Sequence, residues 1–393
     1  MQKIIIKNFG AIVDAEIEIK KILVLIGDNA TGKSTIIKLI STFLWIEKKL
    51  FRGSDPKRLE SEDELIISFL RYHRIESFLK DNSVIEYYGK IFIIKYCNNK
   101  ISIENQADNG YLLPQIMYVP AERNFLTYLR TTKDLQSGGA LQDFEREFIN
   151  AANNLQSASL SLPFRDFEIE YNQQEKLMYL INKEHKIKMM EAASGFQSSA
   201  PLYLVSYYLS KLIQNNGNNE TMTSGDIREF EKEVDNILKN KDLTEQQKQI
   251  AISTLSKKFN KKAFINIVEE PEQNLFPVSQ MQLTKSLVSI CNQNEDNKLL
   301  ISTHSPYVLA TINNLILAHK VGKKFPNETS SKVDKQLWLN YSDVFAAIVK
   351  NGTVEELIDK DFEMIEVEQL DAVSRIINEE FDYLYEYETA GND

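Results

Sequence analysis

Eight residues near the start of the chain, GDNATGKS at positions 27–34, restrict its fold more than any other stretch. They fit the pattern G-x-x-x-x-G-K-[ST], and they follow an apolar strand and precede a helical pattern. In such a turn small residues let backbone N–H groups surround a phosphate, the lysine neutralises it, and the serine hydroxyl is offered to magnesium. The sequence therefore predicts a strand, a phosphate-binding turn and a helix in direct succession.

A second feature lies more than two hundred residues later, where an apolar strand ends in three carboxylates within INIVEEPEQNLFP (265–277). Adjacent carboxylates repel one another unless a cation, a water or a phosphate group separates them. Such a pair is often only the start of a helix. Beside a phosphate-binding turn, however, Glu269 is expected to hold a magnesium ion and Glu270 to orient the attacking water.

Two further motifs follow the same logic. His304 stands just past the apolar strand in LLISTHSPYVL, where it can contact the terminal phosphate and the water, although a lone histidine is more often a plain surface or core residue. The stretch ASGFQSS (193–199) predicts a helix start capped by Ser194.

Short apolar segments and helical patterns alternate along most of the chain. Residues 2–8 and 12–26 have strand patterns, the second broken near Lys20, and a helix then extends to about Leu50. Three later segments, QIMYVP, AFINIV and KLLIST, have buried-strand patterns. Strands that alternate with helices in this way form a mostly parallel sheet flanked by helices, so we expect an α/β protein.

Two stretches interrupt this alternation. Residues 51–110 have a charged helical pattern and then a hairpin with Asn98 and Asn99 at its turn. Residues 217–262 have a polar start and two charged helical patterns. Both are predicted to be insertions.

Most of the negative charge lies at the end of the chain. The net charge is −10, and residues 355–393 hold fourteen Asp and Glu against Lys360 and Arg375, which is −12 and leaves about +2 for the rest. Apolar residues recur at helical spacing in this segment, which predicts an amphipathic helix with an acidic face. They are Leu370, Val373, Ile376, Ile377, Phe381 and Leu384.

Composition excludes several other classes. No apolar run approaches the roughly 18 residues that cross a bilayer, and the first residues lack a signal-peptide core, so a cytoplasmic protein without membrane contact is expected. Cys97 and Cys291 are far apart, which indicates neither a disulfide framework nor a zinc site.

In order, GDNATGKST, ASGFQ, VEEPE and STHSP resemble the Walker A, signature, Walker B and switch-histidine motifs of the ABC-type ATPase superfamily. The opening IIIKNFGAI, the long insertions and the forms EEPEQNLFP and THSPYVL resemble its soluble branch, which includes SMC, RecF and OLD-like ATPases and ATPase subunits of bacterial antiphage systems. The resemblance implies a P-loop head over residues 1–310 with an N-terminal antiparallel β portion. Residues 311–393 are then expected to form an acidic, largely helical segment.

The resemblance also implies ATP and Mg²⁺ as cofactors and assigns residue roles. Lys33, Glu270 and His304 would be catalytic, and Ser34, Glu269 and Glu122 would face the metal. Glu122 is included because YVPAERN lacks the family's Q-loop glutamine, and Glu269 stands where aspartate is usual. The expected ATP contacts are Gly27, Asn29, Ala30, Thr31, Gly32, Lys33, Ser34 and Thr35, with Ser194, Gly195 and Gln197 reaching the ATP of a second protomer.

A signature that serves ATP in trans implies a homodimer or a higher homo-oligomer. Our first hypothesis is a nucleotide-gated sensor or switch subunit of an antiphage or DNA-associated complex, whose effector is a separate protein. Nuclease activity in this chain is not expected, because the only Asp-x-Asp candidate, at 359–361, follows TVEELI, which has a helical pattern.

A second hypothesis is a repair or chromosome-maintenance ATPase that clamps DNA directly, and a third is an ATP-binding scaffold that hardly hydrolyses. Two basic clusters could hold DNA phosphates, although such clusters are usually solvated faces. The first contains Lys48, Lys49, Arg52, Lys57 and Arg58, and the second contains Lys257, Lys258, Lys261 and Lys262.

Overall fold

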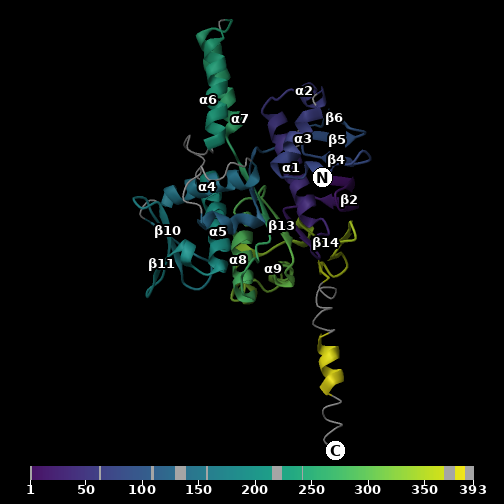
Figure 1. Ribbon diagram of the computed structural model, residues 1–393, viewed down its shortest axis with the longest axis vertical. Helices are drawn as coiled ribbons and strands as arrows, with labels where there is room; N and C mark the ends of the chain where they lie inside the picture. Colours follow the sequence, from purple (N-terminus) through teal and green to yellow (C-terminus); the bar gives the residue numbers. More distant parts are fainter. Residues whose placement is uncertain are drawn as a thin grey trace, which may run out of the picture.

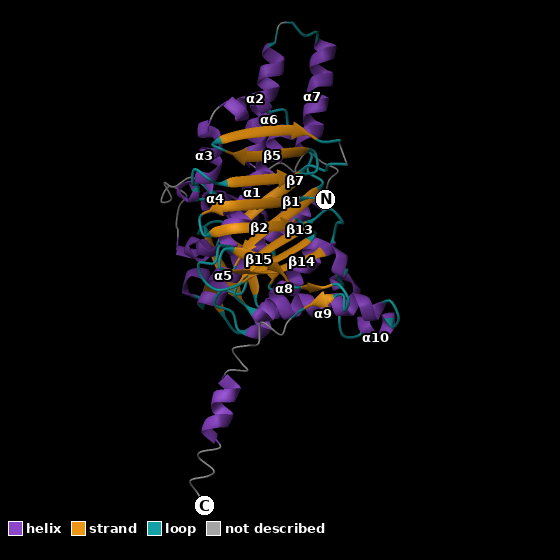
Figure 2. Ribbon diagram, turned by 90° about the vertical axis from the view of Figure 1, so that its right-hand side faces the viewer, coloured by secondary structure: helices purple, strands orange, loops and turns teal. Residues whose placement is uncertain are grey.

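The computed structural model describes residues 2–61, 63–107, 110–128, 139–155, 158–214, 224–240, 242–366 and 377–385. Its centre is an eleven-stranded sheet in the order β6-β5-β4-β1-β2-β15-β14-β3-β13-β12-β7. Figure 2 shows this sheet with helices around it. Helices flank this sheet, so the predicted α/β class is confirmed, and the sheet combines a parallel half with an antiparallel half.

Five neighbouring strands form the parallel half of the sheet: β14 (Val344–Lys350), β3 (Ile22–Ile26), β13 (Lys298–Thr303), β12 (Ala263–Glu269) and β7 (Pro114–Val119). Every residue of β3, β7 and β12 is buried, as expected for strands covered on both faces. Strand β13 separates β3, which precedes the glycine-rich turn, from β12, which carries the carboxylates.

The antiparallel half contains β1 (Lys3–Phe9), β2 (Ile12–Glu18), β4 (Val84–Tyr88), β5 (Phe92–Cys97) and β6 (Lys100–Asn105). The predicted turn of the hairpin β5–β6 is confirmed, because Asn98 and Asn99 have φ values of 51° and 57°. The expected insertion at 51–110 therefore contributes three strands to the sheet, of which β4 was not predicted, besides α2 (Pro56–Ser61) and α3 (Asp63–Tyr72).

The prediction of a largely helical segment after residue 310 is wrong for residues 344–365. Strand β14 lies beside β3, and TVEELI forms β15 (Thr353–Glu356) and the start of the small pair β16 (Ile358–Asp359) and β17 (Met364–Ile365). Asn351 and Gly352 join β14 to β15 with φ values of 52° and 76°, and this two-residue turn sets the hairpin. Pairing and burial in the sheet override the weak helical pattern.

Residues 377–385 are helical, as predicted, and the side chains of Ile377, Phe381 and Leu384 are 57 to 67% exposed. Leu370, Val373 and Ile376 lie outside the described residues.

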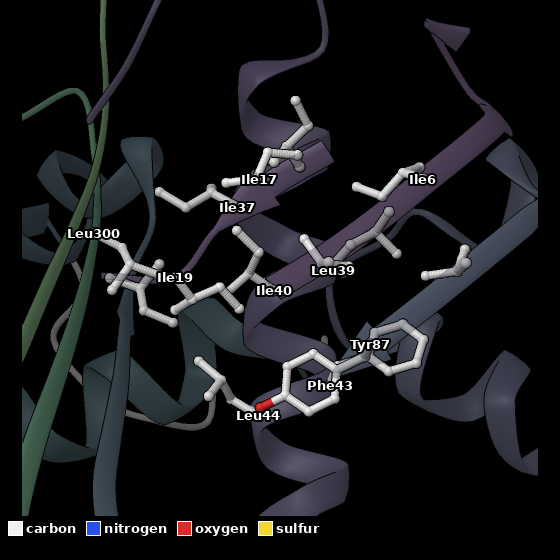
Figure 3. Close-up of a cluster of buried hydrophobic side chains, with 14 of the residues drawn as sticks. Ile6, Ile17, Ile19, Ile37, Leu39, Ile40, Phe43, Leu44, Tyr87 and Leu300 are labelled. Atoms are coloured by element: carbon white, nitrogen blue, oxygen red, sulfur yellow. The ribbon is translucent and has the colours of Figure 1, made fainter. Parts of the chain in front are cut away.

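Helices cover the two faces of the sheet with two separate apolar layers. Along β3, Leu23 and Leu25 face one layer with α1 (Lys33–Phe51), while Ile22 and Val24 face the other. Figure 3 shows the first layer, in which α1 side chains such as Ile40 and Phe43 pack with residues of the sheet. The second layer contains α5 (Ser194–Gln214), α8 (Pro277–Asn292) and α9 (Pro306–Gly322), and α10 (Pro326–Ser330) follows α9.

A smaller lobe packs against α4 (Ala140–Leu155) and α5 around a third apolar cluster. Its sheet has the order β11-β10-β9-β8, with β8 (Ser159–Ser161), β9 (Glu168–Asn172), β10 (Leu177–Ile181) and β11 (Lys186–Lys188).

The second insertion forms the helix pair α6 (Ser224–Lys239) and α7 (Glu245–Phe259), which projects from the body of the molecule (Figure 1). Among the described helices, none combines the length and apolarity needed to cross a bilayer.

Glu47 fastens α1 to the antiparallel strands. Its buried carboxylate accepts hydrogen bonds from the Tyr87 hydroxyl, at 2.7 Å, and from the Ile91 backbone N–H, at 3.0 Å. Burial raises the pKa of Glu47 above its ordinary value of 4.5, although these hydrogen bonds oppose the shift.

This raised pKa predicts a pH dependence of stability. Since folded Glu47 keeps its proton to higher pH than unfolded Glu47, its contribution is fully present below pH 4.5 and is lost as pH rises through the folded pKa. Urea unfolding of wild type and Glu47→Gln across this range should show the wild-type free energy of unfolding falling relative to the variant. Parallel curves would contradict the assignment.

Candidate nucleotide site

The carboxyl ends of four parallel strands meet at one edge of the sheet. Pairing in register aligns Glu269 with Ser302, and Thr303 with Ile26. The glycine-rich turn after β3, the histidine after β13, the carboxylates after β12 and the loop after β7 therefore emerge side by side. In open α/β sheets this edge is where ligands bind.

The glycine-rich turn has the backbone that its sequence predicts. Gly27 and Gly32 have φ values of 151° and 109°, which favour glycine, and Ala30 is left-handed at 60°. A Cβ on Gly27 would lie 2.4 Å from the Val349 carbonyl oxygen, so β14 backs the turn closely. Helix α1 begins at Lys33 and directs its free N–H groups into the turn. Asn29 is exposed on the turn, and the Thr31 hydroxyl donates to the Asp28 carbonyl.

Lys33 lies folded into this turn. Its side-chain nitrogen donates to the carbonyls of Gly27, at 2.7 Å, and Asp28, at 2.6 Å, and the residue is buried. Burial lowers the pKa of Lys33, while the carboxylates of Glu270, Asp28 and Glu272 act in the opposite direction. Lys33 and the glutamates that follow β12 thus share one electrostatic environment.

Glu269 has a buried carboxylate oriented toward α1. Its Oε2 accepts from the Ala121 N–H at 3.1 Å, and its Oε1 lies 3.9 Å from the Lys38 ammonium, one helical turn after Ser34. Within the described residues Oε1 has no hydrogen-bond partner. A buried carboxylate at this edge of the sheet fits Mg²⁺, which takes few protein ligands besides phosphate oxygens and water.

Glu122 is exposed and lines a cavity of about 190 Å³ together with Lys38 and Tyr118. Burial, and then the Glu269 carboxylate, raise the pKa of Tyr118 well above its ordinary value. Glu122 therefore lies in the neighbourhood of Glu269, and its contact with a metal stays a prediction.

Glu270 and His304 face each other beyond the strand ends. His304 Nε2 lies 3.5 Å from Glu270 Oε1, and about a third of each side chain is exposed. The Glu270 backbone is left-handed, with a φ of 44°, and its N–H donates to the Ser302 carbonyl at 2.8 Å. Glu272 Oε1 accepts from the His304 N–H at 2.6 Å. Uncommon backbone of this kind persists where the surroundings hold it, and it often marks a functional site.

Arg123 is the functional residue that the sequence analysis missed. It is fully buried, and its guanidinium donates to the carbonyls of Pro120, Glu269, Glu270 and Ser198 at 2.6 to 3.1 Å. Burial lowers its pKa to about 10, and the surrounding glutamates oppose the shift. One side chain thus joins the loop after β7, the end of β12 and the signature helix α5. The sequence feature that could have indicated this role is the arginine in YVPAERN, which follows a buried strand.

The signature residues lie against the loop that follows Glu270. A Cβ on Gly195 would be 2.6 Å from the Asn274 carbonyl oxygen, and the Ser198 hydroxyl donates to the Gln273 carbonyl at 2.7 Å. Ser194 is exposed at the start of α5. The Gln197 amide instead turns inward and donates to the carbonyls of Met190 and Ala192. Contacts of these residues with a second ATP stay predictions.

The Asp-x-Asp stretch at 359–361 has a structural role. Asp359 Oδ1 accepts from the backbone N–H groups of Asp361 and Phe362, which closes a local turn. The described residues contain no cluster of three or more His, Cys, Asp or Glu side chains suited to a metal.

The first basic cluster is largely packed against aromatic rings. Lys48 lies over Trp45 and is buried, Lys49 lies over Phe69, and Arg52 lies over Phe259. In the second cluster, Lys261 is buried.

Strand order, glycine-rich turn and strand-end carboxylates together define the fold of a P-loop ATPase. Comparison with family models identifies the family. Residues 1–263 and 243–309 match the AAA ATPase domain, and the chain belongs to this family. No match was found among proteins of curated function.

Several solved structures are similar over most of the chain. An SMC head bound to the C-winged helix domain of ScpA is 8% identical, with 92% of this chain and 99% of that chain covered and a TM-score of 0.40. The SMC head domain from Thermotoga maritima is 10% identical, with 90% and 97% covered and a TM-score of 0.36. A dimeric ATP-binding cassette with ADP and Pi is 11% identical, with 90% and 96% covered and a TM-score of 0.30.

The position of Arg123 predicts that it orients the strand-end carboxylates. Arg123→Lys keeps the charge but cannot make four directed hydrogen bonds, so we expect a loss of about 1–3 kcal/mol in stability. If the residue positions Glu270, kcat for ATP hydrolysis should fall about tenfold or more while ATP affinity is retained. A matched control is Arg146→Lys, at an exposed arginine 3.0 Å from Asp143. Equal kcat values for both variants would contradict this role.

Proposed function

We propose that this protein binds ATP with Mg²⁺ and hydrolyses it to ADP and phosphate. The observation that carries the proposal is the meeting of Lys33, Glu269 and the Glu270–His304 pair at one edge of the sheet. Each group has the chemistry that phosphoryl transfer to water requires: a cation for the phosphates, a metal-binding carboxylate and a base near a histidine.

The roles follow from position and burial. Lys33 and the N–H groups from Gly27 to Thr35 would hold the phosphates, and Ser34 and Glu269 would hold magnesium, with Glu122 as an outer contact. Bound magnesium would neutralise charge on the phosphate oxygens. Glu270 would orient the attacking water and accept its proton, and His304, beside it, would steady that carboxylate and the terminal phosphate.

We also propose that two copies enclose two ATP molecules head to head, with Ser194 and Gly195 facing the partner's nucleotide. Large apolar side chains are exposed close to the site, which supports a protein partner there: Phe276 is 66% exposed, Val278 53% and Tyr307 51%. Loss of the terminal phosphate contacts after hydrolysis would then loosen the dimer.

Substitution of Glu270, the proposed base, distinguishes an active ATPase from a scaffold that hardly hydrolyses ATP. Glu270→Gln should bind ATP normally, accumulate as an ATP-bound dimer and lose about 100-fold or more in kcat. Lys33→Ala should lose ATP binding. Calorimetry, size-exclusion chromatography and phosphate release measure these three properties. A Glu270→Gln variant with wild-type turnover would contradict the assignment of the base.

The finer proposal is a nucleotide-gated switch, in an antiphage or DNA-associated complex, that acts on a separate effector protein. Two surfaces that lie outside the nucleotide site could bind such an effector, which supports this proposal. They are the projecting pair α6–α7, on which Leu238 and Ile250 are exposed, and the helix 377–385 (Figure 1). Direct clamping of DNA is the second candidate. The packing of Lys48, Lys49 and Arg52 against aromatic rings favours the first.

Recovery of partners distinguishes the two. Glu270→Gln purified from native cells with ATP and magnesium should retain a protein partner, and a variant with Phe381 and Leu384 changed to Ser should lose it if the helix 377–385 is the docking element. Clamping of DNA would instead give nucleic acid in the same preparation, with an affinity that falls steeply as salt rises.

A further inference from the structure

A small cavity lies beside the exposed start of the signature helix. It has a volume of about 230 Å³ and lies between the loop at residues 164–165, the start of α5 and residues 274–276. Ser194 and Gly195 form one wall, and the rings of Phe164, Phe196 and Phe276 form much of the rest. None of the residues of the chain's own glycine-rich turn, and neither Glu270 nor His304, is among the described residues that line it.

Arg165 is the one charged side chain among the described residues that line this cavity. The residue is exposed, and within the described part of the chain its guanidinium forms no hydrogen bond or ion pair. The Arg123 guanidinium, by contrast, donates its hydrogen bonds to backbone carbonyls in the interior. Arg165 therefore offers five unused N–H donors to a cavity that Ser194 and the start of α5 also line.

Aromatic contacts hold the Arg165 loop on the signature helix. Phe164, the neighbour of Arg165, stacks on Phe196 with ring centroids 5.8 Å apart, and Phe167 meets the same ring edge-on at 5.0 Å. Phe196 follows Ser194 and Gly195 on the same helix, so these ring contacts tie the position of the Arg165 loop to that of Ser194.

We propose that Arg165 binds the terminal phosphates of the ATP held by the partner protomer and stabilises their charge during hydrolysis. The inference deepens the proposed head-to-head dimer and depends on it. A guanidinium, a serine hydroxyl and a helix N-terminus together suit a phosphate group, and Arg recognises phosphates through paired hydrogen bonds. Closure of the dimer would bring the three Phe rings over the site and exclude water, which strengthens the interaction.

The first test compares single substitutions. Arg165→Ala should lower the ATPase rate about 100-fold, and ATP affinity should stay within about twofold because Lys33 and its turn are intact. The control is Lys183→Ala, which removes an exposed cation that lines a neighbouring cavity with Arg165 but not the cavity at the signature. It should leave the rate unchanged. Arg165→Ala with wild-type rate and wild-type thermal stability would overturn the proposal.

The second test determines which protomer supplies the arginine. When Arg165→Ala is mixed with Lys33→Ala, each mixed dimer has one site with an intact turn from one chain and an intact Arg165 from the other. An equimolar mixture should therefore recover about a quarter of wild-type activity from two poorly active proteins. If Arg165 acted on its own chain's ATP, no site would be intact and the mixture would stay inactive.

A parallel mixture of Ser194→Arg with Lys33→Ala makes the two possible failures distinguishable. Recovery with Ser194→Arg but not with Arg165→Ala would overturn the role of Arg165 and leave the head-to-head dimer standing. Recovery with neither would overturn the composite site itself, and the inference about Arg165 with it.

Discussion

Parallel pairing in register is the constraint on which this site depends. Because β3, β13 and β12 run in the same direction and end together, residues 27, 304 and 270 emerge at one edge although they are far apart in the chain. Strand β14 pairs with the other side of β3 and places Val349 behind Gly27. A shift of one residue in any of these pairings would turn the strand-end side chains to the opposite face.

The buried guanidinium of Arg123 adds a second level of organisation. Strand register alone brings the chain segments to one edge of the sheet. Arg123 then fixes the spacing between the loop after β7, the end of β12 and α5, because its guanidinium donates to the carbonyls of Ser198, Glu269 and Glu270. Since one of these carbonyls belongs to Ser198 on α5, the guanidinium connects α5 to the backbone of Glu269 and Glu270.

Local patterns predicted the glycine-rich turn and the strand before the carboxylates well, and the strands after residue 340 poorly. Gly27 to Ser34 and the strand ending at Glu269 were predictable because each motif is continuous in sequence. TVEELI was predicted to be helical, although the preceding Asn351-Gly352 is a strong hairpin signal that outweighs the weak helical pattern. Arg123 was missed because a side chain that binds backbone carbonyls leaves no partner in the sequence to search for.

The amino-acid sequence by itself determined the glycine-rich turn, the carboxylates at a strand end and the helical insertion before β12, because each depends on neighbours within a few residues. Only the tertiary structure decided that β14 joins the central sheet, that Arg123 links three segments, that Gln197 turns inward and that Arg165 lies beside Ser194. These outcomes depend on contacts between residues tens to hundreds of positions apart. Such contacts are settled by burial and hydrogen bonding in the folded chain, which no local pattern records.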